Sequence, residues 1–479
     1  MRPERSPGIK LLLAGLVAAV LIVPLMMVYA LVWDRQNQAQ TAQGAIVEGW
    51  GGPQVIAGPV IAVPYRTTEQ QTTVEDGRNV TRTVTLDKTL YLSPDSNRVT
   101  TSIAPEEKQK SIYRTVLFAA EVKGEARFAV PADLARFGIP ADQLQWDKAQ
   151  LRLGVSDARG LTDGGRLTVA GEALDLRPGS GPAATGGQGF FAFLPWDGTG
   201  ELAVSYAYGL RGSRSLSLVP RGGVTDWKVT STWPSPSFHG SFLPTRPEIS
   251  GEGFTAEYRI DKLALGQPPV STSDYGPPMI DSGREGYSSE PMVVAEVAGD
   301  VSAGPSRAIS VDLIEPVNLY SKVDRAVKYG FLFIGFTFLA FLLFDIVGGA
   351  RVAAAEYLLT GAGLVLFFVL LLAFAEVVGF AIAYLVASGA IIGLVSAYSA
   401  AVLDSWKRAR FMSALLVGLY ALLYVLLNLE GLSLLIGAVL LFLALAGVMY
   451  ATRRVDWSAV GRSDGAGDGA GDEPGSPAA

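Results

Sequence analysis

The sequence predicts an α+β membrane protein with six transmembrane helices, one N-terminal and five C-terminal, and a large β-rich extracytoplasmic domain between the first and second. Three observations support this prediction. Of the 479 residues, 49% are hydrophobic and only 18% are charged, whereas soluble domains carry about 25% charged residues. The longest apolar runs lie near the two ends of the chain. The central segment is interrupted by Gly and Pro, which are typical of turns between strands.

The first apolar run, residues 11–32, contains no charge and is interrupted only by Pro24. At 1.5 Å per residue, a helix of this length can cross a hydrocarbon core of about 30 Å. A cleaved signal peptide also begins with a basic segment, but its apolar part is about 7–15 residues long, which is shorter than this run. We therefore expect an uncleaved anchor, with the N-terminus and first helix covering residues 1–33.

Five further apolar runs follow the central segment, at residues 330–347, 357–375, 377–403, 411–427 and 432–451. Six alternating crossings place all ten Lys and Arg residues outside the central segment on one side of the membrane: Arg2, Arg5, Lys10, Arg351, Lys407, Arg408, Arg410, Arg453, Arg454 and Arg462. The positive-inside rule then makes both termini cytoplasmic. The predicted domains are an extracytoplasmic β domain at 34–328, a five-helix bundle at 329–452 and a disordered cytoplasmic tail at 453–479.

Alternating polar and apolar residues predict strands at 81–92, 202–208, 215–219, 228–232 and 254–260. Residues 116–130 fit a helix or a strand equally well. Residues 51–64 contain three prolines, which favour a short, broken edge strand. Residues 268–284 are rich in Pro, Gly, Ser and Asp and predict a long exposed loop. The length of the segment allows one β domain or two sub-domains.

The composition excludes several kinds of site. The chain has no Cys and a single His, so disulfides, thiolate metal sites and multi-histidine metal sites are absent. A net charge of −6 gives no general attraction for nucleic acid. No phosphate-binding loop, G-x-S-x-G elbow or H-E-x-x-H motif occurs. We therefore predict no metal, no cofactor and no nucleic-acid partner.

His239 is the only imidazole in the chain, and Ser241 lies two residues after it. A catalytic Ser–His pair needs converging side chains and a third group that orients the ring, and proximity in a Pro-rich loop supplies neither. We expect a structural loop here and no catalytic residue. Two acidic pairs could act on a glycan, but we interpret them as solvated surface: Glu106 with Glu107, and Glu75 with Asp76.

Within the predicted bundle, Asp345, Glu356 and Glu376 lie near the ends of apolar runs, where each side chain can reach a membrane interface. Small residues allow helices to approach closely, and they occur in two places, at Gly361 with Gly363 and at Gly389 with Gly393. Packing inside the bundle is the preferred interpretation of both pairs. A homo-oligomer that forms through Gly389 and Gly393 would show the same spacing.

Six segments resemble the CreD family of bacterial inner-membrane proteins. They are GPQVIAGPVIAVP (52–64), SDARG (156–160), GGQG (186–189), SLVP (217–220), STWPSPSFHGSFLP (231–244) and DRAVKY (324–329). The resemblance extends from the first span to residue 457, and residues 70–79 and the tail after 457 look like additions of this chain. It implies a multi-pass inner-membrane protein that is associated with cell-envelope integrity and often linked to a sensor kinase and a response regulator. It implies no enzymatic activity, cofactor or catalytic residue.

Three functions remain open from the sequence. The preferred one is a non-catalytic protein whose periplasmic β domain binds an envelope component, either a protein or a glycan. The first alternative is a permease or channel with a periplasmic receptor or gating domain. The second is an envelope hydrolase that uses carboxylates. The lack of charge inside the apolar runs argues against transport, and the lack of a convergent motif argues against hydrolysis.

Overall fold

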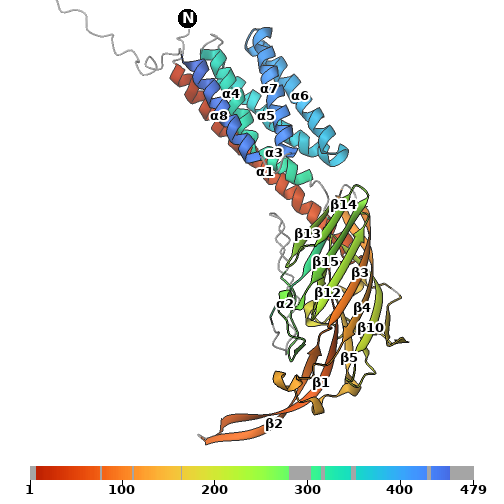
Figure 1. The fold of residues 1–479 in the computed structure, drawn as a ribbon. Helices are drawn as coiled ribbons and strands as arrows, with labels where there is room; N and C mark the ends of the chain where they lie inside the picture. Colours follow the sequence, from red (N-terminus) through yellow and green to blue (C-terminus); the bar gives the residue numbers. More distant parts are fainter. Residues whose placement is uncertain are drawn as a thin grey trace, which may run out of the picture. The chain divides into compact units, whose positions relative to one another are not determined.

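The computed structural model describes residues 7–75, 78–110, 113–162, 164–279, 304–313, 319–346, 352–428 and 433–453. The chain divides into two units. One comprises residues 1–39 and 317–479, and the other comprises residues 40–316. The first unit consists of apolar helices and the second of β-sheets, which confirms the predicted α+β class (Figure 1). Most of the predicted tail lies outside the described residues.

The helical unit contains seven helices among its described residues: α1 (Pro7–Val47), α3 (Leu319–Lys328), α4 (Gly330–Ile346), α5 (Ala354–Val378), α6 (Phe380–Val402), α7 (Trp406–Asn428) and α8 (Ser433–Thr452). Five segments within the described part are long and apolar enough to cross a membrane: Gly8–Val47, Leu319–Asp345, Ala354–Val378, Phe380–Val402 and Trp406–Asn428. The helix α8 occupies the position of the sixth predicted span without being one of these five. Five spans are therefore supported, and the sixth crossing stays a prediction.

The first helix is held by small residues on its neighbours. Its buried residues Ala14, Leu21 and Val28 recur every seven positions and form one stripe. Leu21 fills the space above Gly361 of α5, where an added Cβ would lie 2.0 Å from the Leu21 Cδ1 atom. Gly361 thus serves close packing inside the bundle, as the sequence suggested.

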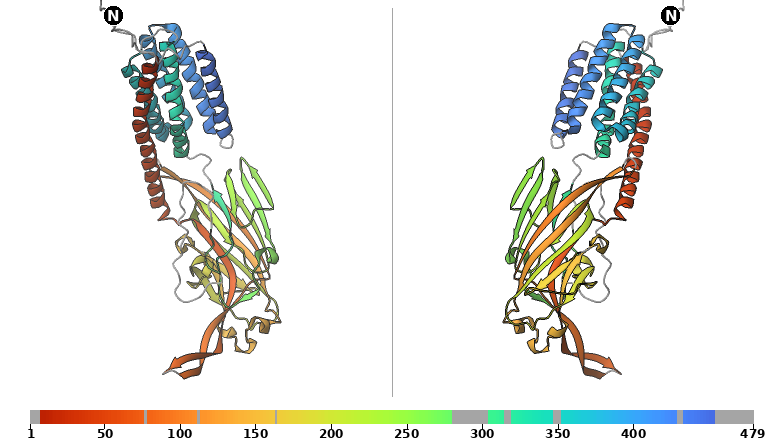
Figure 2. Two further views of the ribbon diagram at one scale, coloured as in Figure 1. Left: turned by 90° about the vertical axis from the view of Figure 1, so that its left-hand side faces the viewer. Right: turned by 90° about the vertical axis from the view of Figure 1, so that its right-hand side faces the viewer.

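Two sheets form the second unit (Figures 1 and 2). Sheet A has nine strands: β1 (Gln54–Glu75), β2 (Arg78–Leu92), β5 (Gln150–Val155), β8 (Arg177–Pro178), β9 (Gly189–Phe193), β11 (Ser215–Val219), β13 (Pro236–Gly240), β16 (Val270–Ser271) and β17 (Ile309–Leu313). Sheet B has eight: β3 (Ser96–Lys110), β4 (Tyr113–Phe128), β6 (Arg166–Val169), β7 (Glu172–Ala173), β10 (Leu202–Ser213), β12 (Val224–Ser231), β14 (Arg246–Ser250) and β15 (Gly253–Ile260). A one-turn helix, α2 (Lys262–Leu265), follows β15.

The strand order explains how the sheets are built. Sheet A runs β13-β17-β11-β1-β5-β9-β8, with β2 paired to β1 and β16 paired to β2. Sheet B runs β14-β15-β12-β3-β4-β10-β6-β7. Most neighbours are antiparallel, but β1 pairs with β11, and β3 with β12, in parallel. These parallel pairs join segments far apart in the chain, so the sheets mix local hairpins with distant partners.

The core of this unit is one apolar cluster that includes Phe118, Phe128 and Trp227, each at most 1% exposed. Trp227 stacks on Tyr258, and its Nε1 donates to the hydroxyl of Thr101 at 2.9 Å. A buried Trp that keeps a hydrogen-bond partner contributes its full apolar surface without leaving an unpaired donor. The described strands form one unit rather than two sub-domains.

All five predicted strands are confirmed, by β2, β10, β11, β12 and β15. Residues 116–130, which fitted either structure, fall mostly in β4. The predicted short edge strand at 51–64 is wrong, because β1 is 22 residues long and lies in the middle of sheet A. Its prolines are tolerated because the register with β5 shifts between Ala57 and Val60, and the pairing with β5 ends at Ala62.

The predicted exposed loop at 268–284 is also partly wrong. Val270 and Asp274 are buried, at 2% and 5% exposed, and residues 280–284 lie outside the described part. Asp274 Oδ1 lies 2.5 Å from Arg221 Nη1, and its Oδ2 accepts the backbone N–H of Ala183 at 2.7 Å. A polar, Pro-rich composition suggested solvent, but the carboxylate is buried together with its own cation.

Candidate functional site

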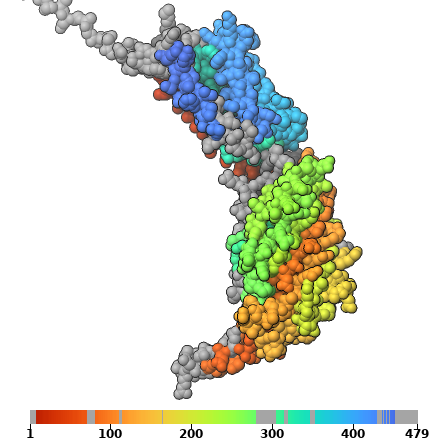
Figure 3. All heavy atoms as spheres, viewed as in Figure 1, coloured from red at the N-terminus to blue at the C-terminus, as the bar shows by residue number. Residues whose placement is uncertain are grey.

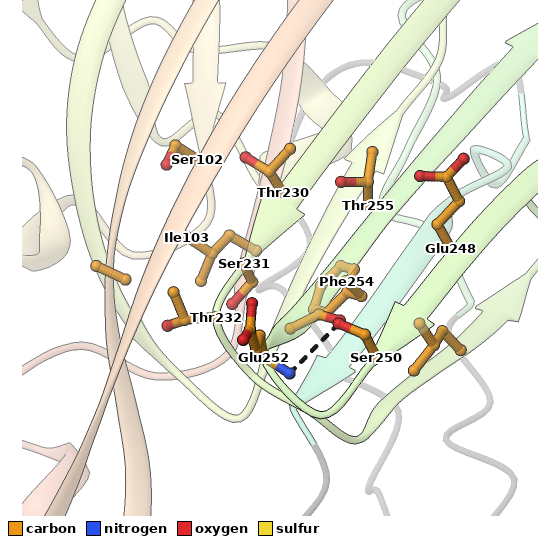
Figure 4. A pocket seen from close by; sticks show the side chains of 13 residues that line it. Ser102, Ile103, Thr230, Ser231, Thr232, Glu248, Ser250, Glu252, Phe254 and Thr255 are labelled. Carbon is orange, nitrogen blue, oxygen red and sulfur yellow. Dashed lines mark hydrogen bonds between the residues drawn. The ribbon is translucent and has the colours of Figure 1, made fainter.

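A row of four polar side chains crosses the outer face of sheet B. The register places Ser102 of β3 opposite Thr230 of β12, Thr230 opposite Thr255 of β15, and Thr255 opposite Glu248 of β14. In β3, β12 and β15 the alternate residues are buried in the core, so Ser102, Thr230 and Thr255 lie on the outer face. All residues of β14 are exposed, and the register places Glu248 beside Thr255. Figure 4 shows them side by side, one from each strand. Neighbouring strands are about 4.8 Å apart, so the row repeats at that spacing.

The row forms one wall of an open groove of about 540 Å³. The turn between β14 and β15 forms another wall, and inside it the Ser250 hydroxyl accepts the Glu252 backbone N–H at 3.3 Å (Figure 4). Gly253 has φ +140°, and a Cβ there would lie 2.1 Å from the Ser231 carbonyl oxygen. Only glycine therefore allows the turn to approach β12 so closely. In the space-filling view, β3 (orange) lies beside the green surface of β12, and β15 follows on the other side of β12 (Figure 3).

The lining gives the groove a defined chemistry. Thirteen residues line it, among them six hydroxyl side chains and two carboxylates, Glu248 and Glu252, and none of the thirteen is Lys or Arg. An ion pair lies two residues along β12 and β15 from the row, where Lys228 donates to Glu257 at 2.9 Å and holds the pKa of that carboxyl below its usual range. The groove is therefore suited to a hydroxyl-bearing or cationic ligand rather than an anionic one.

His239 lies on β13, directly opposite Ser310 of β17. Its Nε2 atom is 2.8 Å from Asp312 Oδ1, an arrangement that can orient an imidazole. Ser241, the nucleophile considered from the sequence, is exposed directly after β13, and its backbone N–H donates to the Ala308 carbonyl oxygen at 2.7 Å. Ser310, opposite His239, is fully buried and its hydroxyl pairs with that of Ser217 at 2.5 Å. The His–Asp contact joins β13 to β17. The loop predicted around His239 is wrong, because residues 236–240 form a strand, and the absence of catalysis at His239 stays a prediction.

The acidic pair Glu106 and Glu107, considered from the sequence, does not line the groove. Glu106 is exposed and lies 2.5 Å from Lys108, and Glu107 is exposed beside it. Asp76, the second member of the other pair, lies outside the described residues. Among the residues that the structure describes, no group of three or more His, Asp or Glu side chains could hold a metal ion.

The acidic residues of the helical unit have polar partners. Asp345 is the second-to-last residue of α4, and its side chain is 2% exposed and pairs with Lys10 in the first turn of α1. The pair lies at the ends of both helices, and its place at a membrane interface stays a prediction. Glu356 lies in the first turn of α5 and accepts the Ala353 N–H at 2.7 Å. Glu376 lies in the last turns of α5, where the Tyr320 hydroxyl donates to it at 3.2 Å. The burial of Asp345 could not be predicted from its position at the end of an apolar run, because its partner Lys10 is 335 residues away in sequence.

The two small-residue pairs also differ from each other. Gly363 faces Val395 of α6, with an added Cβ 3.6 Å from that side chain. Among the residues that the structure describes, nothing lies within 4 Å of a Cβ added at Gly389 or Gly393, so packing against the described helices is the wrong interpretation for this pair. The residues lie on an open face of α6, and association through them stays untested.

Two of the six segments that carried the resemblance connect strands of the β unit. Gln54 is fully buried, and its Nε2 donates to the carbonyl oxygens of Asp157 (3.3 Å) and Arg211 (2.9 Å). The Gly52 N–H donates to Asp157 Oδ2 at 3.3 Å, and a Cβ at Gly160 would lie 2.3 Å from the Arg211 carbonyl oxygen. The segments at 52–64 and 156–160 therefore fasten β1 to β5 and β10 instead of forming a pocket.

Sequence reasoning missed the groove. The alternation in β12 and β15 identifies Thr230 and Thr255 as outward-facing, but it does not tell which strands are neighbours. The parallel pairing of β12 with β3 joins residues about 130 positions apart, and that pairing completes the row.

Comparison with known proteins gives a consistent result over most of the chain. The family profile described as "Inner membrane protein CreD" matches residues 6–458. The protein named Inner membrane protein CreD from Escherichia coli (strain K12) is 32% identical over 452 residues, which cover 92% of this chain and 91% of that protein.

Proposed function

Because the chain belongs to the CreD family of inner-membrane proteins, we propose that it is a non-catalytic protein of the cell envelope whose β domain binds a hydroxyl-rich envelope component, such as a cell-wall glycan. The observation that carries the proposal is the row of Ser102, Thr230, Thr255 and Glu248 on an open sheet face. Regularly spaced hydroxyl and carboxylate groups can exchange hydrogen bonds with a repeating polyol. A groove without a cation does not favour teichoic acids or phospholipid head groups.

Binding is tested with the full-length protein purified in detergent and sedimented with isolated cell-wall glycan. We expect the wild-type protein to sediment with the glycan, and the double variant Thr230→Val/Thr255→Val to lose at least about tenfold in affinity, which corresponds to two hydrogen bonds of about 0.5–1.5 kcal/mol each. Valine keeps the branched shape and removes the hydroxyl, so folding is preserved.

A matched control uses Thr100→Val. Thr100 lies on the same face of β3, two residues before Ser102, and does not line the groove. This variant should bind glycan like wild type. Equal binding by all three proteins contradicts the groove as the site, and sedimentation only with anionic lipid vesicles contradicts the proposed ligand class.

The orientation in the membrane is part of the same proposal. The sorting of Lys and Arg to one side supports cytoplasmic termini and a periplasmic β domain. A reporter fused after Glu376 should be active outside the cytoplasm, and one fused after Arg408 should be active inside. A cytoplasmic signal at Glu376 contradicts the six-span topology.

A second candidate function is a permease or channel in which the β domain acts as receptor or gate. One observation favours it, namely the buried Asp345 paired with Lys10 within the helical unit. Intramembrane ionisable residues are costly and often mark substrate or proton paths. Transport by reconstituted vesicles that Asp345→Asn abolishes would favour this alternative over the binding function.

A further inference from the structure

The helical unit buries an ion pair at one end of α1. Lys10 Nζ lies 2.8 Å from Asp345 Oδ1 and 3.4 Å from the Asp345 carbonyl oxygen. The side chain of Asp345 is 2% exposed and that of Lys10 is 24% exposed. A charged pair in an apolar unit is stable only with well-formed hydrogen bonds, and such pairs commonly face a cavity or a neighbouring polar group.

Helices α1 and α4 meet at this pair, and α5 packs against α4 one turn away, at Phe341. Lys10 contacts Asp345, and fifteen residues further along α1, Leu25 lies against Gly330, which is fifteen residues earlier in α4. The two helices are therefore antiparallel over about 22 Å. Tyr357 of α5 lies against α4, with its ring 5.2 Å from that of Phe338 and 5.9 Å from that of Phe341.

Three hydroxyl groups at this junction have no hydrogen-bond partner within the described part of the chain: Thr337 of α4, and Tyr357 and Thr360 of α5. Their residues are 0%, 3% and 2% exposed. Thr337, Phe341 and Asp345 are spaced by four residues on one face of α4, and Tyr357 and Thr360 are neighbours on α5. The polar groups therefore continue from the ion pair along the α4–α5 contact.

An unpaired polar group inside a bilayer costs several kcal/mol, and irregular polar surface is tolerated where it lines a water-filled space. Buried water typically makes about three hydrogen bonds to polar groups that lack other partners. We infer that Asp345, Tyr357, Thr360 and Thr337 form a water-binding column between α4 and α5 that opens at the Lys10–Asp345 pair. Water at these positions satisfies the three hydroxyls and connects the interior of the unit with the aqueous phase at the end where α1 begins.

The absence of Cys from the natural chain permits a direct test. The full-length variants Thr360→Cys and Leu359→Cys are reconstituted in vesicles and treated with a water-soluble methanethiosulfonate reagent. Leu359 is next to Thr360 at nearly the same depth along α5. Its side chain is 60% exposed on the outer surface of the helical unit, which faces lipid in the proposed membrane arrangement, so a thiol there should meet little water. The reagent attacks the thiolate, which forms only where water reaches. We expect Thr360→Cys to react at least about tenfold faster than Leu359→Cys.

Trp406→Cys, at the exposed start of α7, shows that the reagent is active. If Thr360→Cys does not insert in the membrane, Thr337→Cys replaces it with the same expectation. An unreactive thiol at the column position, alongside a reactive Trp406→Cys, overturns the inference because the junction is then dry. Equal reaction at Leu359 and Thr360 also overturns it, since access would not be confined to the column.

Discussion

Two ion pairs of the β unit place the same chemistry in opposite surroundings. Arg221 and Asp274 lie just after β11 and β16 of sheet A, and their pair is covered, with side chains 5% and 6% exposed. On sheet B, the Arg259–Asp226 pair is open, with side chains 70% and 36% exposed and a separation of 3.2 Å. Hydroxyl groups follow the same division, since Ser217 and Ser310 pair with each other under cover, whereas Thr230 and Thr255 face the groove. A covered face uses its polar groups to hold the fold, and an open face leaves them available for a ligand.

The largest expected effect comes from removing the covered carboxylate. Asp274→Ala leaves the Arg221 guanidinium buried beside Ser93 without its counter-ion, and breaking such a pair costs about 3–5 kcal/mol of unfolding free energy. Asp226→Ala removes the open partner of Arg259 and should cost about 0–1 kcal/mol. Chemical denaturation of the full-length protein in detergent, followed by tryptophan fluorescence, measures both variants. Equal losses would contradict the contrast between the two faces.

The same contrast shows what the sequence could and could not predict. The strands β11 and β15 follow from alternation alone, because each has one face in the core. Asp274 was interpreted as part of an exposed loop, because its partner Arg221 is 53 residues away and no local pattern reports that contact. Pro59 in β1 suggested an edge strand, because proline has no backbone N–H to donate. The register shift that accommodates it depends on pairing with β5, which the sequence does not reveal. Local periodicity identifies elements, whereas burial of polar groups depends on distant neighbours.

A smaller effect is expected at the joint between β1 and β5, and it depends on pH. Arg159 is the main cause that holds the pKa of Asp157 below its usual range, with a further contribution from the Gly52 N–H. A lowered pKa in the folded state stabilises the protein above the unfolded value of about 3.9, and this stabilisation is lost as the pH falls through the folded value. Asp157→Asn should therefore lower stability at pH 6 and flatten its decrease between pH 5 and pH 3.

Asp95 serves as the control, because its pKa is shifted in the opposite direction from that of Asp157. Burial raises the pKa of its carboxyl, so the folded state binds this proton more readily than the unfolded state. The stabilisation that results is fully present below the pKa of the unfolded state and is lost as the pH rises through the pKa of the folded state. Asp95→Asn should steepen the decrease in stability toward pH 3. Thermal unfolding midpoints at pH 3, 4, 5 and 6 distinguish the two, and a parallel shift for both variants would contradict the assignment.

The smallest effect on stability should occur in the groove, and it should accompany the clearest effect on binding. Ser310→Ala leaves the fully buried Ser217 hydroxyl without its partner and should cost about 1–3 kcal/mol. Thr255→Val removes a hydroxyl of the same kind from the open face, where water already competes for it, and should change stability by less than about 0.5 kcal/mol. Glycan sedimentation should show the reverse order, with Thr255→Val weakened and Ser310→Ala unchanged at temperatures where it is folded. A stable Thr255→Val protein that binds glycan like wild type would show that the exposed row serves only the fold, and the open face of sheet B would lose its assigned role.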